Sequence, residues 1–336
     1  MYFISRERIE QSGIADPIVT QRLIERTFRQ KAQGTAVSAQ EVALAAGARE
    51  AGAFYSLPAY LAEEGVAGLK WTSHVPQPDH GLPYTHPVVL LNDLATGRPL
   101  AILEGELISG LRTGAVSATA IRTLAGSRAS SLLVCGSGYQ AGHQLRSIVP
   151  FMPELKEVHV WSRTPLHAEQ LVEQHTGILR ERGIQARVHV SLPDHLDFAE
   201  VVVGATAASE PYLRAEHFVR GHLYLHVGMR DIDSEAIQSF DDIVCDDYEA
   251  GVPSSSQSLF GLARKSPDIV RKVTLLETLL AQPDQAKQQH PSRKTMFNAF
   301  GLSIFDLVLA NEALKRLMES AGEHLEQFDL SKERKI

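Results

Sequence analysis

Residues Leu132 to Ala141 read LLVCGSGYQA, and this segment is the most informative about the fold. An apolar segment of strand length ends in the pattern G-x-G-x-x-A, and a helix-compatible segment follows. Gly136 allows a sharp turn, Gly138 lets the backbone approach a pyrophosphate, and Ala141 lets the helix pack closely on the strand. The free N–H groups at the start of such a helix attract phosphate. The stretch therefore predicts a dinucleotide site rather than a turn that serves packing alone.

The turn after the next apolar segment indicates which dinucleotide is bound. Val158–Trp161 continues into Ser162, Arg163 and Thr164, where NAD sites usually place an acid for the ribose hydroxyls. A guanidinium between two hydroxyls suits a ribose phosphate instead. We therefore expect NADP(H) to be preferred, with NAD(H) and a simple polar turn as the alternatives. The candidate cofactor contacts in the two turns are Gly136, Ser137, Gly138, Tyr139, Gln140, Ala141, Ser162, Arg163 and Thr164.

Apolar, β-branched segments recur through the middle of the chain. They are Ser131–Cys135, Val158–Trp161, Ala186–Val190, Glu200–Gly204, Leu223–Gly228 and Asp242–Cys245. Their continuous hydrophobicity is typical of parallel strands that are buried on both faces. Most are separated by enough chain for a helical crossover. We expect an α/β fold with a Rossmann-type, doubly wound parallel sheet of six strands.

The N-terminal third has a different pattern. Asp16–Gln33 has apolar residues at helical spacing, with Asp16 as N-cap and Pro17 in the first turn. Strand-like segments separated by turns follow, and helical patterns come after them and near the C-terminus. The strand-like segments are Gly68–Ser73, Pro87–Asn92 and Leu100–Gly105, and the helical ones are Ser109–Ala125 and Phe305–Ala321. We expect an α+β domain of residues 1–112 with 305–336, and a dinucleotide-binding domain of residues 113–304.

Composition excludes several functional classes. Lys and Arg number 33 against 40 Asp and Glu, a net charge of −7, which disfavours nucleic acid or an anionic membrane as partner. Two cysteines are too few for a disulfide framework or a thiolate metal site, and His217, His222 and His226 are loosely spaced, so we expect no metal. No apolar run reaches the roughly 18 residues of a membrane helix, and the first residues lack a signal core. We expect a cytoplasmic protein with a small-molecule partner.

Four strings together resemble the ornithine cyclodeaminase/mu-crystallin family. They are LRTGAVSA at residues 111–118, VGMRD at 227–231, LPAY at 57–60 and the glycine loop, followed late in the chain by Phe300-Gly301-Leu302 and Asp306. The string before the glycine loop is the most specific. Two segments look more like the dehydrogenases of diaminopropionate biosynthesis, namely Leu91-Asn92-Asp93 and the Met-Arg-Asp-Ile loop. The turn after Trp161 looks more like the NADPH-linked ketimine reductases.

The resemblance implies a homodimer whose substrate-binding and dimerisation domain is built from the N-terminal part and the C-terminal helix. It also implies hydride transfer at an amino-acid Cα–N bond. Arg112 would pair with the substrate carboxylate, Lys70 would be a second cation there or at the imine nitrogen, and Asp231 would move protons at that nitrogen. Thr113 and Thr206 would contact the cofactor.

Each of these residues also has a purely structural interpretation. Arg112 could form an interdomain salt bridge, and Lys70 could be a surface lysine after a strand. Asp231 could be the N-cap of a helix near Ser234–Phe240, and Asp233 competes with it for either role. These alternatives stay open at the level of the sequence.

One departure from the family pattern affects the substrate. Where the family often carries Q-P-x-[RK], whose cation contacts the substrate carboxylate, this chain has Val37–Val42, and ungapped comparison places Glu41 at the cation. An acid there would favour a basic substrate group and repel a second carboxylate. The alternative is a solvent-exposed Glu41 and a shifted alignment.

The expected function is an NAD(P)-dependent oxidoreductase that acts on the CH–NH or C=N bond of an amino acid or an amino-acid-derived imine. Its substrate could be arginine or lysine, a cyclic ketimine, or a conjugate of the diaminopropionate pathway. The alternatives are an ornithine cyclodeaminase-type lyase with a recycled NAD, and a non-enzymatic binder of NADPH and a small ligand. Lys70, Arg112 and Asp231 together favour catalysis, because a binder needs no proton shuttle.

Overall fold

The computed structural model describes residues 1–45, 52–75, 83–125, 128–219, 221–282, 293–320 and 325–326. The chain divides into two compact units, Met1–Arg112 with Leu302–Ile336, and Thr113–Gly301. Helix α3 (Gly105–Leu124) begins in the first unit and ends in the second. The end of the C-terminal segment assigned to the first domain, from residue 327 on, lies outside the described residues.

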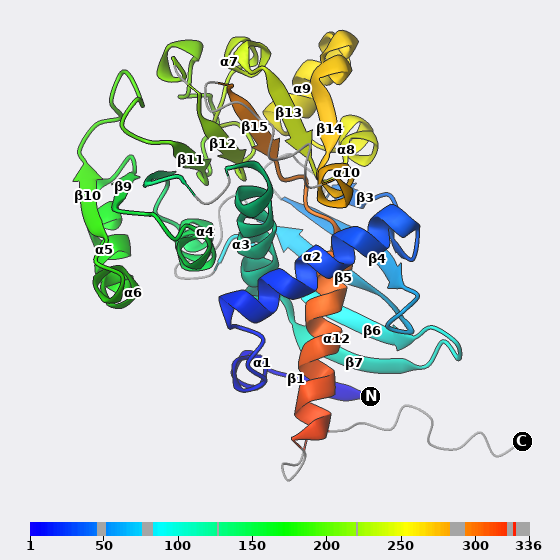
Figure 1. Ribbon diagram of the computed structural model, residues 1–336. Helices are drawn as coiled ribbons and strands as arrows, with labels where there is room; N and C mark the ends of the chain where they lie inside the picture. The colour runs from blue at the N-terminus through cyan, green and yellow to red at the C-terminus, as the bar shows by residue number, and fades with distance from the viewer. Residues whose placement is uncertain are drawn as a thin grey trace, which may run out of the picture. The chain divides into compact units, whose positions relative to one another are not determined.

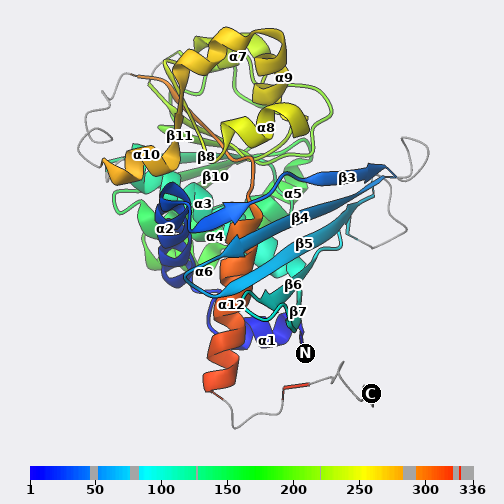
Figure 2. The same cartoon turned by 90° about the vertical axis from the view of Figure 1, so that its right-hand side faces the viewer.

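The first unit is a seven-stranded sheet with helices on one face. Its strands run in the order β1-β7-β6-β5-β4-β2, with β3 also paired to β4; β1 pairs in parallel with β7 and the other pairs are antiparallel. The strands are β1 (Tyr2–Ile4), β2 (Ala36–Ser38), β3 (Val42–Ala45), β4 (Ala53–Leu61), β5 (Val66–His74), β6 (Val88–Asp93) and β7 (Pro99–Glu104). The helices are α1 (Arg6–Gln11), α2 (Pro17–Gln33) and α12 (Ser303–Glu319). Figure 2 shows α2 and α12 against this sheet.

Buried and more exposed side chains alternate along the strands, and the buried ones lie on the face that the helices cover. Leu57, Val89 and Leu103 lie in one cross-strand row and are at most 9% exposed, because α12 packs on β4 and β6 and α1 packs on β7. The expected helix is confirmed at α2, where the Asp16 carboxylate accepts hydrogen bonds from Ile18 N and Val19 N, with Pro17 next to it. The expected antiparallel sheet is also confirmed.

The second unit is a parallel sheet flanked by helices. The strand order is β10-β9-β8-β11-β12-β15-β13-β14, and every pair is parallel. In Figure 2, α7 and α9 lie on one side of this sheet, and α4 and α6 lie on the other. The strands are β8 (Ser131–Cys135), β9 (Glu157–Trp161), β10 (Gln185–His189), β11 (Val201–Gly204), β12 (Leu223–His226), β13 (Asp242–Cys245), β14 (Val273–Leu275) and β15 (Thr295–Asn298). The helices are α4 (Tyr139–Ile148), α5 (Pro165–Gln174), α6 (Thr176–Glu181), α7 (Ser234–Ser239), α8 (Tyr248–Ser254), α9 (Ser258–Lys265) and α10 (Leu276–Ala281), with 3-10 turns at Val149–Phe151, Ala215–His217 and Pro267–Lys272.

The doubly wound α/β fold expected from the sequence is confirmed, with one correction. The sheet has eight strands rather than six, because β14 and β15 join it beyond β12 (Figure 1). All five residues of β8 are buried, as continuous hydrophobicity predicts for a central parallel strand. The order β10-β9-β8-β11-β12 is the Rossmann order 3-2-1-4-5, so the carboxyl end of β8 lies at the switch point where dinucleotides bind.

Candidate functional site

The glycine loop joins β8 to α4 in the geometry that the sequence predicts. Gly136 has a φ of +122°, a left-handed conformation that favours glycine, and a Cβ there would clash with the Ala205 carbonyl oxygen. Gly138 is the N-cap of α4, and its side-chain position faces open space within 4 Å. No side chain of the described residues caps this helix end. The start of α4 therefore presents its first backbone N–H groups to an anion, and the residues present fit a dinucleotide pyrophosphate.

Two further features of the loop bear on the predicted contacts. Tyr139 is exposed and Ser137 is partly exposed, whereas Ala141 is fully buried and lets α4 pack on the sheet. The Gln140 amide oxygen is buried and accepts no hydrogen bond from the described residues.

Gly114 on α3 packs closely on α4, since a Cβ there would overlap Ser147, and the neighbouring Thr113 is buried.

The turn after β9 presents a cation. Arg163 and Thr164 are exposed, and Arg163 directly follows the buried Ser162. The Ser162 hydroxyl donates to the Thr164 carbonyl (2.8 Å), and Thr164 N donates back to Ser162 Oγ (3.2 Å). The Ser162 hydroxyl is therefore hydrogen-bonded within the turn. The exposed Arg163 guanidinium is the group most available to a ribose phosphate.

Asp231 follows β12 at the carboxyl edge of the sheet and is 0% exposed. Its Oδ1 accepts a hydrogen bond from the Thr206 hydroxyl, and its Oδ2 is buried without a hydrogen bond from any described residue. Burial raises the pKa of Asp231 to about 6, against hydrogen bonds that lower it. A carboxyl group with this pKa can hold or release a proton near neutral pH.

Two glycines make the space for the Asp231 carboxylate. A Cβ on Gly204 would lie 2.8 Å from Asp231 Oδ2, and one on Gly228 would clash with the same oxygen. Gly228 N donates to the Gly204 carbonyl (2.8 Å), which fixes the loop after β12 beside the end of β11. Thr206 is next to the glycine loop as well, because its methyl group would lie 3.4 Å from a Cβ on Gly136. The structure therefore brings Gly136, Thr206 and Asp231 together.

The helix that follows this loop is capped by Asp233 and not by Asp231. Asp233 Oδ1 accepts from Ala236 N (2.7 Å) at the start of α7, and its other oxygen pairs with Arg214 (2.9 Å). The interpretation of Asp231 as an N-cap is therefore wrong. Among the residues that the structure describes, no group of three His, Cys, Asp or Glu side chains could hold a metal ion.

A buried ion cluster occupies the first unit. Lys70 on β5 is 4% exposed, and its Nζ lies 3.0 Å from Oδ2 of Asp306, in the first turns of α12. Arg112 Nε lies 3.4 Å from the other oxygen, Asp306 Oδ1. The start of α12 is held to the sheet by Ser303, whose hydroxyl donates to the Pro58 carbonyl (3.3 Å). Lys70 is therefore a buried residue, and its interpretation as a surface lysine is wrong.

The cluster has more positive than negative charge. Asp306 is the only carboxylate among the described residues that forms a salt bridge with Lys70 or Arg112. Burial and the Arg112 charge lower the pKa of Lys70 to about 8, although Asp306 opposes the shift. Arg112 pairs with Asp306, which belongs to the same compact unit. Glu41, before β3, is partly exposed; burial raises its pKa, and the Lys70 charge opposes that shift.

Asp306 is the residue whose role the sequence analysis missed. From the sequence, Asp306 was identified only as part of the family pattern, without a function. An aspartate within the otherwise apolar stretch SIFDLVLA was a signal that could have been followed, because an isolated buried acid requires a cation partner.

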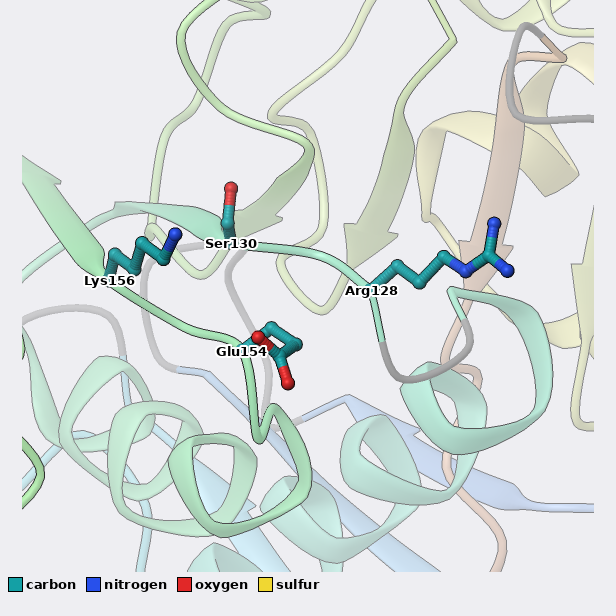
Figure 3. A pocket seen from close by; sticks show the side chains of 4 residues that line it. All are labelled: Arg128, Ser130, Glu154 and Lys156. Atoms are coloured by element: carbon teal, nitrogen blue, oxygen red, sulfur yellow. The ribbon is translucent and has the colours of Figure 1, made fainter.

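A cavity of about 360 Å³ lies elsewhere, lined by Arg128, Ser130, Glu154 and Lys156 (Figure 3). These residues precede β8 and β9, so the cavity is at the amino ends of the strands. Ligands of doubly wound sheets bind outside the carboxyl ends, where the glycine loop and Asp231 lie. The cavity does not belong to the candidate site.

A family model described as ornithine cyclodeaminase/mu-crystallin matches residues 3–320. The chain belongs to this family. It is 27% identical over 263 residues to the Delta(1)-pyrroline-2-carboxylate reductase of Bacillus thuringiensis subsp. konkukian, which covers 75% of this chain and 78% of the relative. It is similar to the structure of Thermococcus litoralis Delta(1)-pyrroline-2-carboxylate reductase in complex with NADH and L-proline, with a TM-score of 0.85 and 25% identity over 95% of this chain and 98% of that chain.

A second solved structure extends the comparison. An archaeal alanine dehydrogenase dimer with bound NAD gives a TM-score of 0.82 and 25% identity, covering 98% of this chain and 99% of that chain. These three relatives are thus reductases and a dehydrogenase, which agrees with the function expected from the sequence. Among the described residues, no helix is long and apolar enough to cross a membrane.

Proposed function

We propose that this family member is an oxidoreductase that prefers NADP(H) and acts on the CH–NH or C=N bond of an amino acid or an amino-acid-derived imine. The observation that carries the proposal is the buried pair of Lys70 and Arg112, which shares the single carboxylate of Asp306. An excess buried positive charge is costly unless a ligand neutralises it, and a substrate carboxylate has the matching charge and shape.

Each residue of the site has its own role in the proposed reaction. Arg112 and Lys70 bind the α-carboxylate of the substrate and orient it. The Asp231 carboxyl moves the proton at the substrate nitrogen through Oδ2, while the Thr206 hydroxyl fixes Oδ1. The N–H groups at the start of α4 hold the cofactor pyrophosphate, and Arg163 pairs with the ribose phosphate of NADP(H). When it is bound, the nicotinamide ring supplies or accepts the hydride.

We also propose that the chain forms a homodimer through the face of the first sheet that α2 and α12 do not cover. On this face the strand alternation places Tyr60, Trp71 and Val88, each 38–40% exposed, and Phe3 at 41%. Phe54 stacks on Trp71 at 5.8 Å between ring centroids. An apolar sheet face of this kind is typical of a symmetric interface.

An absorbance screen at the nicotinamide band tests the proposed activity. All common amino acids are offered with NADP⁺ and NAD⁺ at alkaline pH, and keto acids with amines are offered with NADPH at neutral pH. We expect net cofactor oxidation or reduction with at least one substrate. Ammonia release without a net absorbance change would indicate a cyclodeaminase-type lyase instead, and cofactor binding without any turnover would indicate a binder.

A further inference from the structure

The proposed chemistry leaves one acid near the ion cluster without a role. Glu41 lies between β2 and β3, and no described residue forms a salt bridge with its carboxylate. Lys70 pairs with Asp306 at 3.0 Å, so Glu41 is not the direct counterion of this lysine. It is therefore necessary to identify the positive charge that would pair with the Glu41 carboxylate.

The sheet register places Glu41 in the same row as Lys70. Ala39 N donates to the Pro58 carbonyl (2.9 Å), and Val42 pairs with Ser56, so Gln40 and Glu41 both stand opposite Leu57. Leu57 in turn pairs with Lys70 on β5. The backbones of Glu41 and Lys70 are thus two strand spacings apart, about 10 Å.

Electrostatic effects indicate that Glu41 is near the same face of the sheet as Lys70. The Lys70 ammonium opposes the rise in the pKa of Glu41 that burial causes. The pKa of Tyr55 is raised by burial and then by the Glu41 charge, and Tyr55 lies two residues before Leu57 on β4. Alternate residues of a strand share one face, so Tyr55, Leu57 and Lys70 are on the same face.

The charged groups on this face indicate which kind of ligand would bind there. Lys70 and Arg112 carry two positive charges, and Asp306 and Glu41 carry two negative charges, so these four groups have no net charge. A bound substrate α-carboxylate therefore leaves one negative charge in excess, on the side of the row where Glu41 lies. We propose that Glu41 binds a cationic group at the far end of the substrate, so that the substrate class is an α-amino acid, or its imine, with an amine or guanidine side chain. This rests on the proposed function, because it assumes that Lys70 and Arg112 hold the substrate α-carboxylate.

The same arrangement disfavours dicarboxylic substrates. A second substrate carboxylate near Glu41 would meet the Glu41 carboxylate, and two like charges in a partly buried site repel each other. Neutral side chains would leave Glu41 partly desolvated and unpaired, which also costs binding energy. Only a cationic side chain compensates the charge.

The experiment compares L-lysine with L-norleucine, which has the same carbon skeleton without the distal amine. kcat/KM is measured for both with NADP⁺, for the parent protein, Glu41→Gln and Glu10→Gln, where Glu10 is an exposed residue of α1. L-arginine and L-glutamate are included as a second basic and an acidic substrate. We expect the parent to prefer lysine or arginine over norleucine by about 10- to 100-fold, the scale of a charge-assisted hydrogen bond.

Glu41→Gln should lower this preference by about 10-fold, mainly through KM, whereas Glu10→Gln should keep it. A parent that oxidises norleucine or glutamate as well as the basic amino acids would overturn the proposal. An unchanged preference in Glu41→Gln would overturn it too.

A binding measurement separates this proposal from the proposed function. Calorimetric titration of the protein with lysine and norleucine, with the cofactor present, needs no turnover. If nothing is oxidised or reduced but lysine binds more tightly and Glu41→Gln removes the difference, the proposed function fails and the assignment of Glu41 stands. If turnover occurs without any preference for a basic side chain, the assignment fails and the proposed function stands.

Discussion

Replacing Lys70 with methionine should change how the stability of the protein depends on pH. The Lys70 ammonium is 4% exposed, and burial and the Arg112 charge lower its pKa from 10.5 to about 8. Between these values the unfolded chain holds more protons than the folded protein. Because of Lys70, the free energy of unfolding therefore increases as pH rises from about 8 to about 10.5.

The size of this contribution follows from the pKa values. A change in pKa from 10.5 to about 8 corresponds to about 3 kcal/mol, at about 1.4 kcal/mol for each tenfold change in proton affinity. The free energy of unfolding of the parent, minus that of Lys70→Met, should thus increase by about 3 kcal/mol between pH 7 and pH 11. Other groups that titrate in this range contribute equally to both proteins and cancel.

Urea unfolding followed by circular dichroism, at a series of pH values, measures this difference. Lys156→Met is the matched control, because Lys156 is exposed and its replacement should leave the difference constant within about 0.5 kcal/mol. A difference between parent and Lys70→Met that stays constant from pH 7 to pH 11 would contradict this expectation, since the pKa of Lys70 would then be the same in the folded and the unfolded protein.

Other substitutions test the remaining parts of the site, and sedimentation tests the assembly. Asp231→Asn should retain cofactor binding and lose at least about 100-fold in kcat; turnover within a few-fold of the parent would leave Asp231 as a structural partner of Thr206. Because burial raises the pKa of Asp231 to about 6, the parent's rate of amine oxidation should rise as pH passes through that value, and Asp231→Asn should lack this rise. Arg112→Ala should mainly raise KM by removing the carboxylate anchor, and an unchanged KM contradicts that role. Arg163→Ala should narrow the affinity gap between NADP(H) and NAD(H) by about 1–3 kcal/mol in a fluorescence titration; a parent that binds NAD(H) equally well removes the basis for this expectation. Sedimentation at micromolar concentration should give a dimer of 36.9 kDa chains, and a monomer alone would contradict the proposed interface.

The central strands could be predicted because their signal is local. All residues of β8 and β11 are apolar or small and fully covered, which makes each a continuous hydrophobic run in the sequence. β15 was missed because its short apolar segment is interrupted by polar residues. Asn298 is buried in β15. Its amide oxygen accepts a hydrogen bond from His226 and its amide nitrogen donates one to Gln257, so its polarity is satisfied by partners distant in sequence.

β4 was missed for a different reason. It contains Pro58, which cannot donate a backbone hydrogen bond and which argues against a central strand. The structure accommodates Pro58 beside the two-residue irregularity at Gln40 and Glu41, where pairing passes from β2 to β3. Such a compensation depends on neighbouring strands and leaves no pattern in the strand itself.

The site was predictable one residue at a time but not as a set of contacts. The glycine loop is contiguous, so its turn geometry followed from Gly136 and Gly138. The partner of Lys70 did not, because Asp306 lies 236 residues away in the chain. The space around Asp231 likewise depends on Gly204 and Gly228, which meet only because β11 and β12 are paired.

The most direct test of hydride transfer at a Cα–N bond is isotopic. NADPH with deuterium at the transferable position of the nicotinamide is incubated with the protein and the imine of a basic amino acid, and the product is analysed by mass spectrometry. We predict one deuterium at Cα of the amino acid and one NADP⁺ formed for each product molecule. An unlabelled product, or ammonia release with no net oxidation of the cofactor, would contradict hydride transfer from the cofactor to Cα.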